Sequence, residues 1–431
     1  MADQGAAPLT EAERATIQRR VLWVLASGQV VGAAALATAV TVGAFVIQGI
    51  LGDKTALGGL ATATVTIGTA FTSLWLSRLM RRRGRRPGMQ LGYTLASIGG
   101  LVAAIGAQHR SLPIFVLGLF VFGNGQASNL LARYAATDLA TSEDRSRAMS
   151  RVVFASTFGA VLGPLVIAPV ERAGQDWFGW WKYTGPWVLG SICFAFAAIN
   201  VAVRLRPDPL VVAGGVVPYE RGGIKAPPVR AALQIVSRHP MARLGLLAMV
   251  ISQMTMVAVM MMTPVHLKLH HHEGVSAYVI SLHIAGMYAL APIVGRYADR
   301  RGRLPAIVVG AVVLIGATVL AALSGDVEQL LFPALWALGL GWNFGLIGGS
   351  SLLTESVPAA DRVSVQGSAD LMMSFCGGVA GFSSGFIRKA VGFHALSSFA
   401  TLAAGLLLVT VWPSFQARRR QLSAAAPASA I

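Results

Sequence analysis

The amino-acid sequence predicts an all-α integral membrane protein in which twelve transmembrane helices form two six-helix halves related by pseudo-two-fold symmetry. Three observations predict this fold class. Apolar residues make up 55% of the 431-residue chain and charged residues only 12%, whereas soluble domains contain about 25% charged residues. The apolar residues occur in runs of about 20, the length that a helix needs to cross a bilayer. Motifs in the first half of the chain recur in the second half at an almost constant spacing.

Each apolar run is bounded by charged or turn-forming residues and predicts one membrane-spanning helix. The first run follows Arg19-Arg20, is too long for a cleaved signal sequence and lacks a convincing cleavage site, so we expect it to remain. Before it, Thr10 and Glu13 have the spacing of a capping box, which predicts a short cytoplasmic helix. The predicted spans are 21–48, 56–78, 88–107, 112–137, 149–170 and 185–204, followed by 241–267, 275–297, 305–324, 330–353, 367–388 and 393–413.

A polar interruption rich in Pro and Gly divides the spans into two groups of six. Its composition is typical of a linker rather than of a folded domain. We therefore expect a cytoplasmic N-terminal segment (1–20), a first half (21–204), a cytoplasmic linker (205–240), a second half (241–413) and a cytoplasmic tail (414–431).

The positions of Lys and Arg predict the orientation, because basic loops resist translocation. With both termini in the cytoplasm, 28 of the 35 basic residues lie on that side and 7 on the other. The net charge of +17 is expected to face the lipids of the cell inner (plasma) membrane, since no soluble stretch is long enough for a nucleic-acid-binding domain. Cys193 and Cys376 lie within apolar runs, where we expect packing rather than a disulfide or metal site.

The two halves repeat one another at their loops. Parallel repeats of six spans joined by a cytoplasmic linker are typical of transporters whose halves rock against each other. The matching pairs, at offsets of 217 or 218 residues, are Arg82-Arg83-Gly84-Arg85 with Arg300-Arg301-Gly302-Arg303, Thr137-Asp138 with Thr354-Glu355, and Asp144-Arg145 with Asp361-Arg362.

The segment from Gly295 to Arg303 has the sequence GRYADRRGR and resembles the GxxADRxGR signature of the major facilitator superfamily. Its glycines permit a tight turn, its acid can cap a neighbouring helix N-terminus and its arginines can hold the loop at the headgroups. Together with the spans, the repeat and the linker, the resemblance extends over the whole chain and implies the major facilitator fold. The signature residues are Gly295, Asp299, Arg300, Gly302 and Arg303.

The first copy of this signature departs from the family. Gly84 and Arg85 are kept, but Ser77 replaces the first glycine and Arg81 replaces the acid. In the family that acid is implied to dock across the halves near the eleventh span. We expect Arg81 to pair instead with an acid when the cytoplasmic side is closed; the alternative is a solvated, lipid-facing arginine cluster. The acids at the opposing helix are Glu355, Asp361 and Asp370.

The fifth span contains Gly159, Gly163 and Pro164, a pattern similar to the GxxxGP signature of drug and proton antiporters in this superfamily. The resemblance implies efflux, and the alternative is ordinary close packing of helices. Two departures weaken it: the downstream glycines of the pattern are absent, and Leu119 stands where the fourth span is expected to have an arginine.

Ionisable residues inside apolar spans are costly and therefore indicate function. Asp370 is the most embedded acid and is the first candidate for proton coupling; the alternative is a permanent salt bridge at a gate. Asp138, Glu355 and His283 are further candidates, although His283 also suits simple packing, and Arg133 is a candidate gate residue.

Polar and thioether side chains at membrane depth predict the substrate cavity, because flexible Met surfaces accommodate varied apolar ligands. We expect no metal site, since the adjacent histidines of His270-His271-His272 rarely all point at one ion. The cavity candidates are Gln29, Asn124, Gln126, Asn129, Gln253, Met256, Trp336 and Asn343.

These observations favour a secondary active transporter, and not an enzyme, that exports small amphipathic or apolar compounds in exchange for protons. Its expected partners are a small-molecule substrate, protons and the lipid bilayer, with no nucleic acid and no cofactor, and we expect a monomer. No nucleotide-binding loop of the GxxxxGK type occurs, which argues against ATP as the energy source. The alternatives are a proton-coupled uptake symporter for a sugar or organic acid, an exporter of a metal ion or metal complex, and a non-transporting scaffold or sensor.

Overall fold

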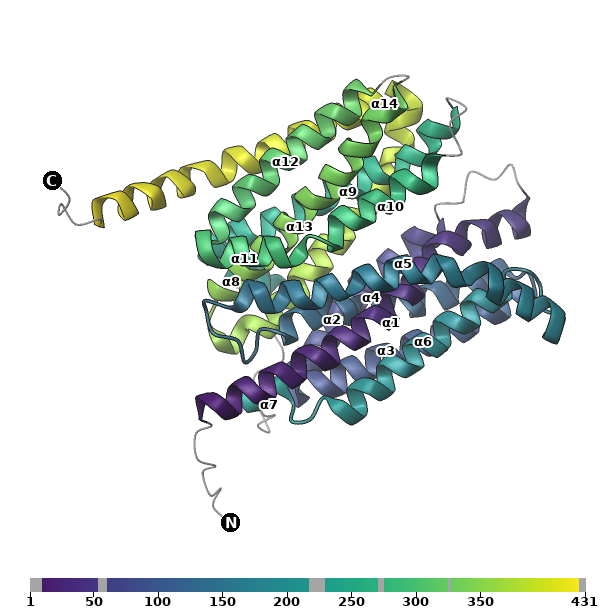
Figure 1. The fold of residues 1–431 in the computed structure, drawn as a ribbon, viewed down its shortest axis with the longest axis horizontal. Helices are drawn as coiled ribbons and strands as arrows, with labels where there is room; N and C mark the ends of the chain where they lie inside the picture. Colours follow the sequence, from purple (N-terminus) through teal and green to yellow (C-terminus); the bar gives the residue numbers. More distant parts are fainter. Residues whose placement is uncertain (1–9, 53–59, 217–228, 270–274, 325–326, 426–431) are drawn as a thin grey trace, which may run out of the picture.

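The computed structural model describes residues 10–52, 60–216, 229–269, 275–324 and 327–425 of the chain. These residues form helices joined by short turns, with no strand among them. Figure 1 shows two groups of helices lying side by side, one from the first half of the chain in purple to teal and one from the second half in green to yellow.

The first group has one helix for each of the six predicted spans. The capping box of Thr10 and Glu13 is present, but it caps the first spanning helix itself and not a separate short helix. Two short helices, α7 (Pro209–Val212) and α8 (Val229–Arg238), follow the group. The six spanning helices are α1 (Glu11–Leu51), α2 (Leu60–Arg83), α3 (Arg85–Gln108), α4 (Leu112–Ala135), α5 (Arg145–Phe178) and α6 (Thr184–Arg204).

The second group departs from the predicted boundaries in two places. The eighth predicted span is divided into α10 (Ser276–Tyr288) and α11 (Ala291–Arg301), where Pro292 lacks the N–H needed to continue a helix. The last two predicted spans are joined as α14 (Arg362–Ala425), broken by non-helical backbone at Gly392. The other helices are α9 (Pro240–Leu269), α12 (Arg303–Leu323), α13 (Leu331–Glu355) and the 3-10 turns η3 (Glu328–Leu330) and η4 (Ala359–Asp361).

Eleven helices of the described residues are long and apolar enough to cross a membrane, and the last of them contains the break at Gly392. Counting that break gives twelve spans within the described part of the chain. The predicted all-α membrane fold is therefore confirmed.

Glycine makes the same turn in both halves. Gly84 between α2 and α3 has a φ of 96°, and Gly302 between α11 and α12 has a φ of 105°. Residues with a Cβ rarely adopt this backbone conformation. The glycine that the repeat places at each loop is thus required by the turn.

Loops from both halves gather at one end of the bundle, which we call the basic end. It contains the turns at Gly84 and Gly302, the segment 136–144 and the segment 356–361. In Figure 1, α1 begins and α14 ends at this end, on the left of the view. The opposed loops allow the two halves to contact each other there.

Candidate functional site

A buried ion pair joins the halves at the basic end. Arg133 of α4 donates from Nη2 to Oδ1 of Asp370 in α14 at 2.5 Å and from Nε to Oγ of Ser350 in α13 at 3.1 Å. The side chains of Arg133 and Asp370 are 1% and 0% exposed. A buried pair of this kind survives only where further hydrogen bonds satisfy the charged groups, and Ser350 and the hydroxyl of Tyr134 provide them. The structure thus brings together two residues that were predicted separately.

A second pair lies between the start of α3 and the loop after α4. Arg85 donates to both carboxylate oxygens of Asp138, from Nε at 2.8 Å and from Nη2 at 3.0 Å. It also donates to Gln366 of α14 at 2.9 Å, so the pair is tied to the other half. Burial raises the pKa of the Asp138 carboxyl, and the Arg85 guanidinium opposes this shift.

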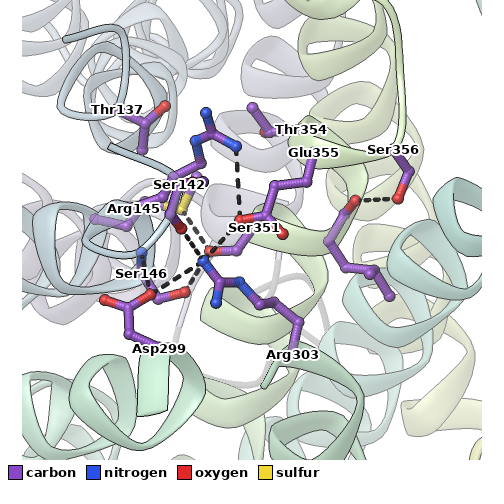
Figure 2. A network of polar contacts seen from close by, with 12 residues as sticks. Thr137, Ser142, Arg145, Ser146, Asp299, Arg303, Ser351, Thr354, Glu355 and Ser356 are labelled. Atoms are coloured by element: carbon purple, nitrogen blue, oxygen red, sulfur yellow. Dashed lines mark hydrogen bonds and ion pairs between the residues drawn. The ribbon is translucent and has the colours of Figure 1, made fainter. Parts of the chain in front are cut away.

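The repeat-related pair in the second half is more exposed. Nη2 of Arg303 lies 2.7 Å from Oε1 of Glu355 in an ion pair, and Nη1 of Arg145 of the first half lies 3.6 Å from the same oxygen. The Glu355 side chain is 25% exposed, against 8% for Asp138. Figure 2 shows the Arg303 guanidinium among Asp299, Ser142 and Glu355. Glu355 therefore bridges the halves through two arginines.

Asp299 caps a helix of the opposite half. Its carboxylate accepts hydrogen bonds from the backbone N–H groups of Ser146 at 3.0 Å and Arg147 at 2.8 Å, in the first turn of α5. A carboxylate is favourable there, because a helix N-terminus has unsatisfied N–H groups and partial positive charge. This is the capping geometry that the motif predicts for its acid. Arg300, in contrast, is exposed.

Arg81 does not have the predicted partner. Among the described residues its guanidinium contacts no acid; Nη1 lies 3.5 Å from Oγ of Ser364, in the first turn of α14. Asp370 is already paired with Arg133, and Glu355 with Arg303 and Arg145. The expected ion pair with Glu355, Asp361 or Asp370 is therefore wrong, and so is the solvated alternative, because Arg81 is buried.

The glycines of the fifth-span motif pack within the first half. A Cβ on Gly159 would lie 2.0 Å from the carbonyl oxygen of Val30, and one on Gly163 would lie 2.7 Å from that of Ala34. Both contacts are to α1. Pro164 lies inside α5 and is exposed. The close helix approach that the motif predicts is present, between α5 and α1.

Three cavity candidates of the first half hydrogen-bond within that half. Gln29 donates to Oγ of Ser156 at 3.0 Å, and Asn124 donates to the carbonyl of Val121 at 2.6 Å. Asn129 accepts from the hydroxyl of Tyr93 at 2.9 Å. Gln126 is half-buried. These contacts position the amides, and they leave the side-chain oxygens of Gln29 and Asn124 without a hydrogen-bond partner among the described residues.

The second-half candidates have varied surroundings. Gln253 of α9 accepts from the indole Nε1 of Trp342 in α13 at 2.6 Å. Asn343 is fully buried, yet neither side-chain amide atom has a hydrogen-bond partner among the described residues. Met256 is buried, whereas Trp336 is 37% exposed.

His283 is buried between helices of the second half. Its Nδ1 lies 2.7 Å from the carbonyl oxygen of Leu335 in α13, and Nε2 has no hydrogen-bond partner within the described chain. Its ring thus links α10 to α13, away from the Arg133–Asp370 pair. The histidines 270–272 lie outside the described residues.

Sequence reasoning did not identify Gln366, Ser350 and Asp208 as functional. Gln366 and Ser350 are neutral residues whose role depends on the arginines that meet them. Asp208, at the start of the predicted linker, accepts from the backbone N–H groups of Arg85 and Arg86 and so caps α3. Asp208 also caps α7, and the Asp208-Pro209 pair is a sequence signal for that helix start alone.

Two bundles of six spans with a polar network at one shared end are typical of transporters whose two halves rock against each other. The family model described as Major Facilitator Superfamily matches residues 25–382 and 246–429. This chain belongs to the major facilitator superfamily and is a secondary transporter.

Its relatives include the uncharacterized MFS-type transporter YdeG of Bacillus subtilis (strain 168), which is 36% identical and aligns over 92% of each chain. The riboflavin transporter RfnT of Brucella anthropi is 28% identical over 92% of this chain and 96% of its own. Among solved structures, the human organic anion transporter MFSD10 (TETRAN) has a TM-score of 0.71 at 15% identity, covering 91% of this chain and 99% of its own. This last likeness concerns the fold.

Proposed function

We propose that this protein is a proton-coupled exporter of small apolar or amphipathic compounds in the cell inner (plasma) membrane, with both termini and the basic end in the cytoplasm. The observation that carries the proposal is the buried ion pair of Arg133 and Asp370, which links the two halves. A carboxylate at this position can hold the basic end closed when ionised and release it when protonated.

The pair suggests a cycle in which proton and substrate move in opposite directions. A proton arriving from the outer side neutralises Asp370, the contact with Arg133 weakens, and the basic end opens. After substrate binds, the proton leaves to the cytoplasm and Asp370 regains its charge. Since an unpaired carboxylate is costly in an apolar surrounding, Asp370 returns to Arg133, and the closed basic end directs the substrate outward.

The candidate cavity residues favour a neutral or weakly polar substrate. They are amides, a thioether and an indole, and none is ionisable. Such groups offer apolar contact and a few hydrogen bonds, as ligand pockets commonly do. Met256 adds an adaptable surface, which suits compounds of varied shape.

The test is export from proteoliposomes under an imposed pH gradient, with a panel of apolar dyes and antibiotics. Asp370→Asn is expected to abolish uphill export, because the amide cannot take up and release a proton, while counterflow exchange persists and shows that the variant is folded. The matched control is Asp361→Asn, which removes a nearby acid that forms no ion pair among the described residues. Undiminished uphill export by Asp370→Asn contradicts the proposal and directs attention to Glu355, Asp138 and His283.

A second candidate is transport of riboflavin or a similar flat heteroaromatic compound. It is favoured by the similarity to the riboflavin transporter RfnT over nearly the whole of both chains. Riboflavin is itself amphipathic, with an apolar ring and a hydroxylated chain. Expression in a riboflavin auxotroph, compared with the empty vector, tests it: growth on low riboflavin supports uptake, and unchanged growth contradicts it.

A further inference from the structure

The two copies of the loop motif place opposite charges at equivalent helix ends. Asp299 near the end of α11 and Arg81 near the end of α2 are related by the repeat offset of 218 residues. Asp299 faces the N-terminus of α5 and accepts two of its backbone N–H groups. Arg81 faces the N-terminus of α14, at Ser364. The first copy thus lacks the carboxylate that the second copy supplies.

The Arg81 side chain is buried without a complete set of partners. The residue is 8% exposed, and its Nε has no hydrogen-bond partner within the described chain. Among the described residues, the one hydrogen bond of its side chain is that of Nη1 to the Ser364 hydroxyl at 3.5 Å. A guanidinium removed from water is costly unless an anion neutralises it. The N-terminus of α14 adds further partial positive charge at the same place.

Nearby acids do not supply the missing charge. Asp370 and Glu355 are bound by other arginines, and Asp361 forms no ion pair with Arg81 in the described part of the chain. In the described part of the chain, the Nε atoms of Arg78 in α2 and Arg362 at the start of α14 are also buried without a hydrogen-bond partner. The end of α2 and the start of α14 therefore carry three guanidinium groups, each with a buried Nε that lacks a hydrogen-bond partner among the described residues.

We propose that the junction between the end of α2 and the start of α14 binds a phosphate group, held by Arg81 and the backbone N–H groups of Val363 and Ser364. The N–H of Arg362 is already bonded to the carbonyl of Ala359. The phosphate takes the place that the Asp299 carboxylate has at α5. Arginine binds phosphate through paired N–H donors, and helix N-termini favour the same ligand. The group comes from free inorganic phosphate or from an anionic lipid headgroup, because the basic end lies where spans meet the membrane surface. The proposal is independent of the transported substrate.

Thermal unfolding of the purified, delipidated protein in an uncharged detergent tests the site. One arm adds inorganic phosphate at constant ionic strength, with gluconate as the balancing anion. The other adds short-chain phosphatidylglycerol, with short-chain phosphatidylcholine as the comparison. We expect one ligand to raise the Tm of the unaltered protein by about 3 °C at saturation, since a ligand that binds only the folded state stabilises it. The arm that gives the rise identifies the source of the phosphate.

Variants at Arg81 assign the rise to this junction. Arg81→Gln is expected to remove it. Arg81→Asp is also expected to remove it, and without ligand this variant should unfold at a higher Tm than Arg81→Gln, because its carboxylate caps α14 as Asp299 caps α5. The control is Arg83→Gln, an exposed arginine of the same last turn of α2, which should keep the full rise.

Three results overturn the proposal. The first is no rise of Tm in the unaltered protein with either ligand, and the second is a full rise in Arg81→Gln. The third is a rise that Arg83→Gln also loses, which assigns binding to the exposed arginine cluster.

Discussion

Two equivalent junctions at the basic end differ in their charge but share their packing. We call the contact of α2 with α14 the first junction and that of α11 with α5 the second junction. In the second, a Cβ on Gly295 would lie 2.3 Å from Oγ of Ser150. In the first, a Cβ on Gly367 would lie 2.0 Å from Oγ of Ser77. The repeat relates Ser77 to Gly295 and Ser150 to Gly367, so the glycine and the serine have exchanged helices.

The exchange explains how Ser77 can replace a signature glycine. Close packing requires that one of two facing residues lacks a side chain, and either helix can provide it. A charged residue cannot be exchanged between the two helices in this way. The N-terminus of a helix carries partial positive charge and is stabilised by an anion only when that anion is on the residue that faces it. The second junction has Asp299 there and the first has Arg81. Packing is thus preserved between the junctions, while electrostatics is not.

The largest expected difference between the halves concerns their loop ion pairs. Arg85→Gln leaves the buried Asp138 carboxylate unpaired, and removing one partner of a buried pair costs about 3–5 kcal/mol. Arg303→Gln should cost less, because Glu355 is partly exposed and keeps Arg145, and the buried Asp299 keeps Arg147 and its two backbone N–H donors. Thermal unfolding of the purified variants measures both. Equal losses contradict the ranking.

The pH dependence of Arg85→Gln provides a second measurement. Burial raises the pKa of folded Asp138 above its ordinary value, and loss of Arg85 removes the group that opposes this shift. When the carboxyl pKa is higher in the folded than in the unfolded state, the folded state loses stability as the pH rises through the folded-state pKa. It regains that stability as the pH falls. The deficit of Arg85→Gln relative to the unaltered protein should therefore shrink on acidification, and a deficit independent of pH contradicts this explanation.

The next largest difference in stability between the two junctions is expected when the helix cap is removed. Asp299→Asn weakens two charge-assisted hydrogen bonds to α5 and leaves Arg303 with less neutralisation, so we expect a loss of about 2 kcal/mol. Arg81→Asn at the first junction should cost much less in ligand-free detergent, because Arg81 has no acid partner among the described residues. Unfolding midpoints of the two variants test this. A greater loss for Arg81→Asn reverses the comparison.

The exchange of glycine and serine can be tested by a double-mutant cycle. Gly367→Ala places a methyl group against Ser77, and overpacking of this kind costs about 1–3 kcal/mol. Ser77→Gly should restore most of the loss, since it reproduces the arrangement of the second junction. Gly295→Ala with Ser150→Gly is the mirrored control. Additive effects in both cycles would show that these pairs do not interact.

The smallest effect is expected at the acids that precede α5 and α14. Asp144 pairs with Arg147, but their side chains are 54% and 40% exposed, and exposed pairs contribute about 0–1 kcal/mol. Asp144→Asn and its repeat equivalent Asp361→Asn should both leave the Tm within about 2 °C of the unaltered protein. A larger loss in either variant would assign that acid a role in its junction.

The sequence alone determined the helical membrane fold, the number of spans and the repeat, because hydrophobicity and length are properties of each segment by itself. It also determined the turns at Gly84 and Gly302, since the need for glycine at a positive φ is local. Asp370, Arg133, Asp138 and Glu355 were found because charge is rare in apolar spans. Their partners were not, since pairing depends on which helices meet.

Only the tertiary structure decided that Arg133 binds Asp370, that Gln366 and Asp208 belong to the network, and that Arg81 faces Ser364 and not an acid. It also decided that Gly159 and Gly163 contact α1. In each case the partner lies far away in the chain, and a neutral partner such as Gln366 or Ser364 has no sequence signal of its own. Charge, length and glycine content are properties of single segments of the sequence, whereas the distances between side chains arise only when the two halves pack against each other.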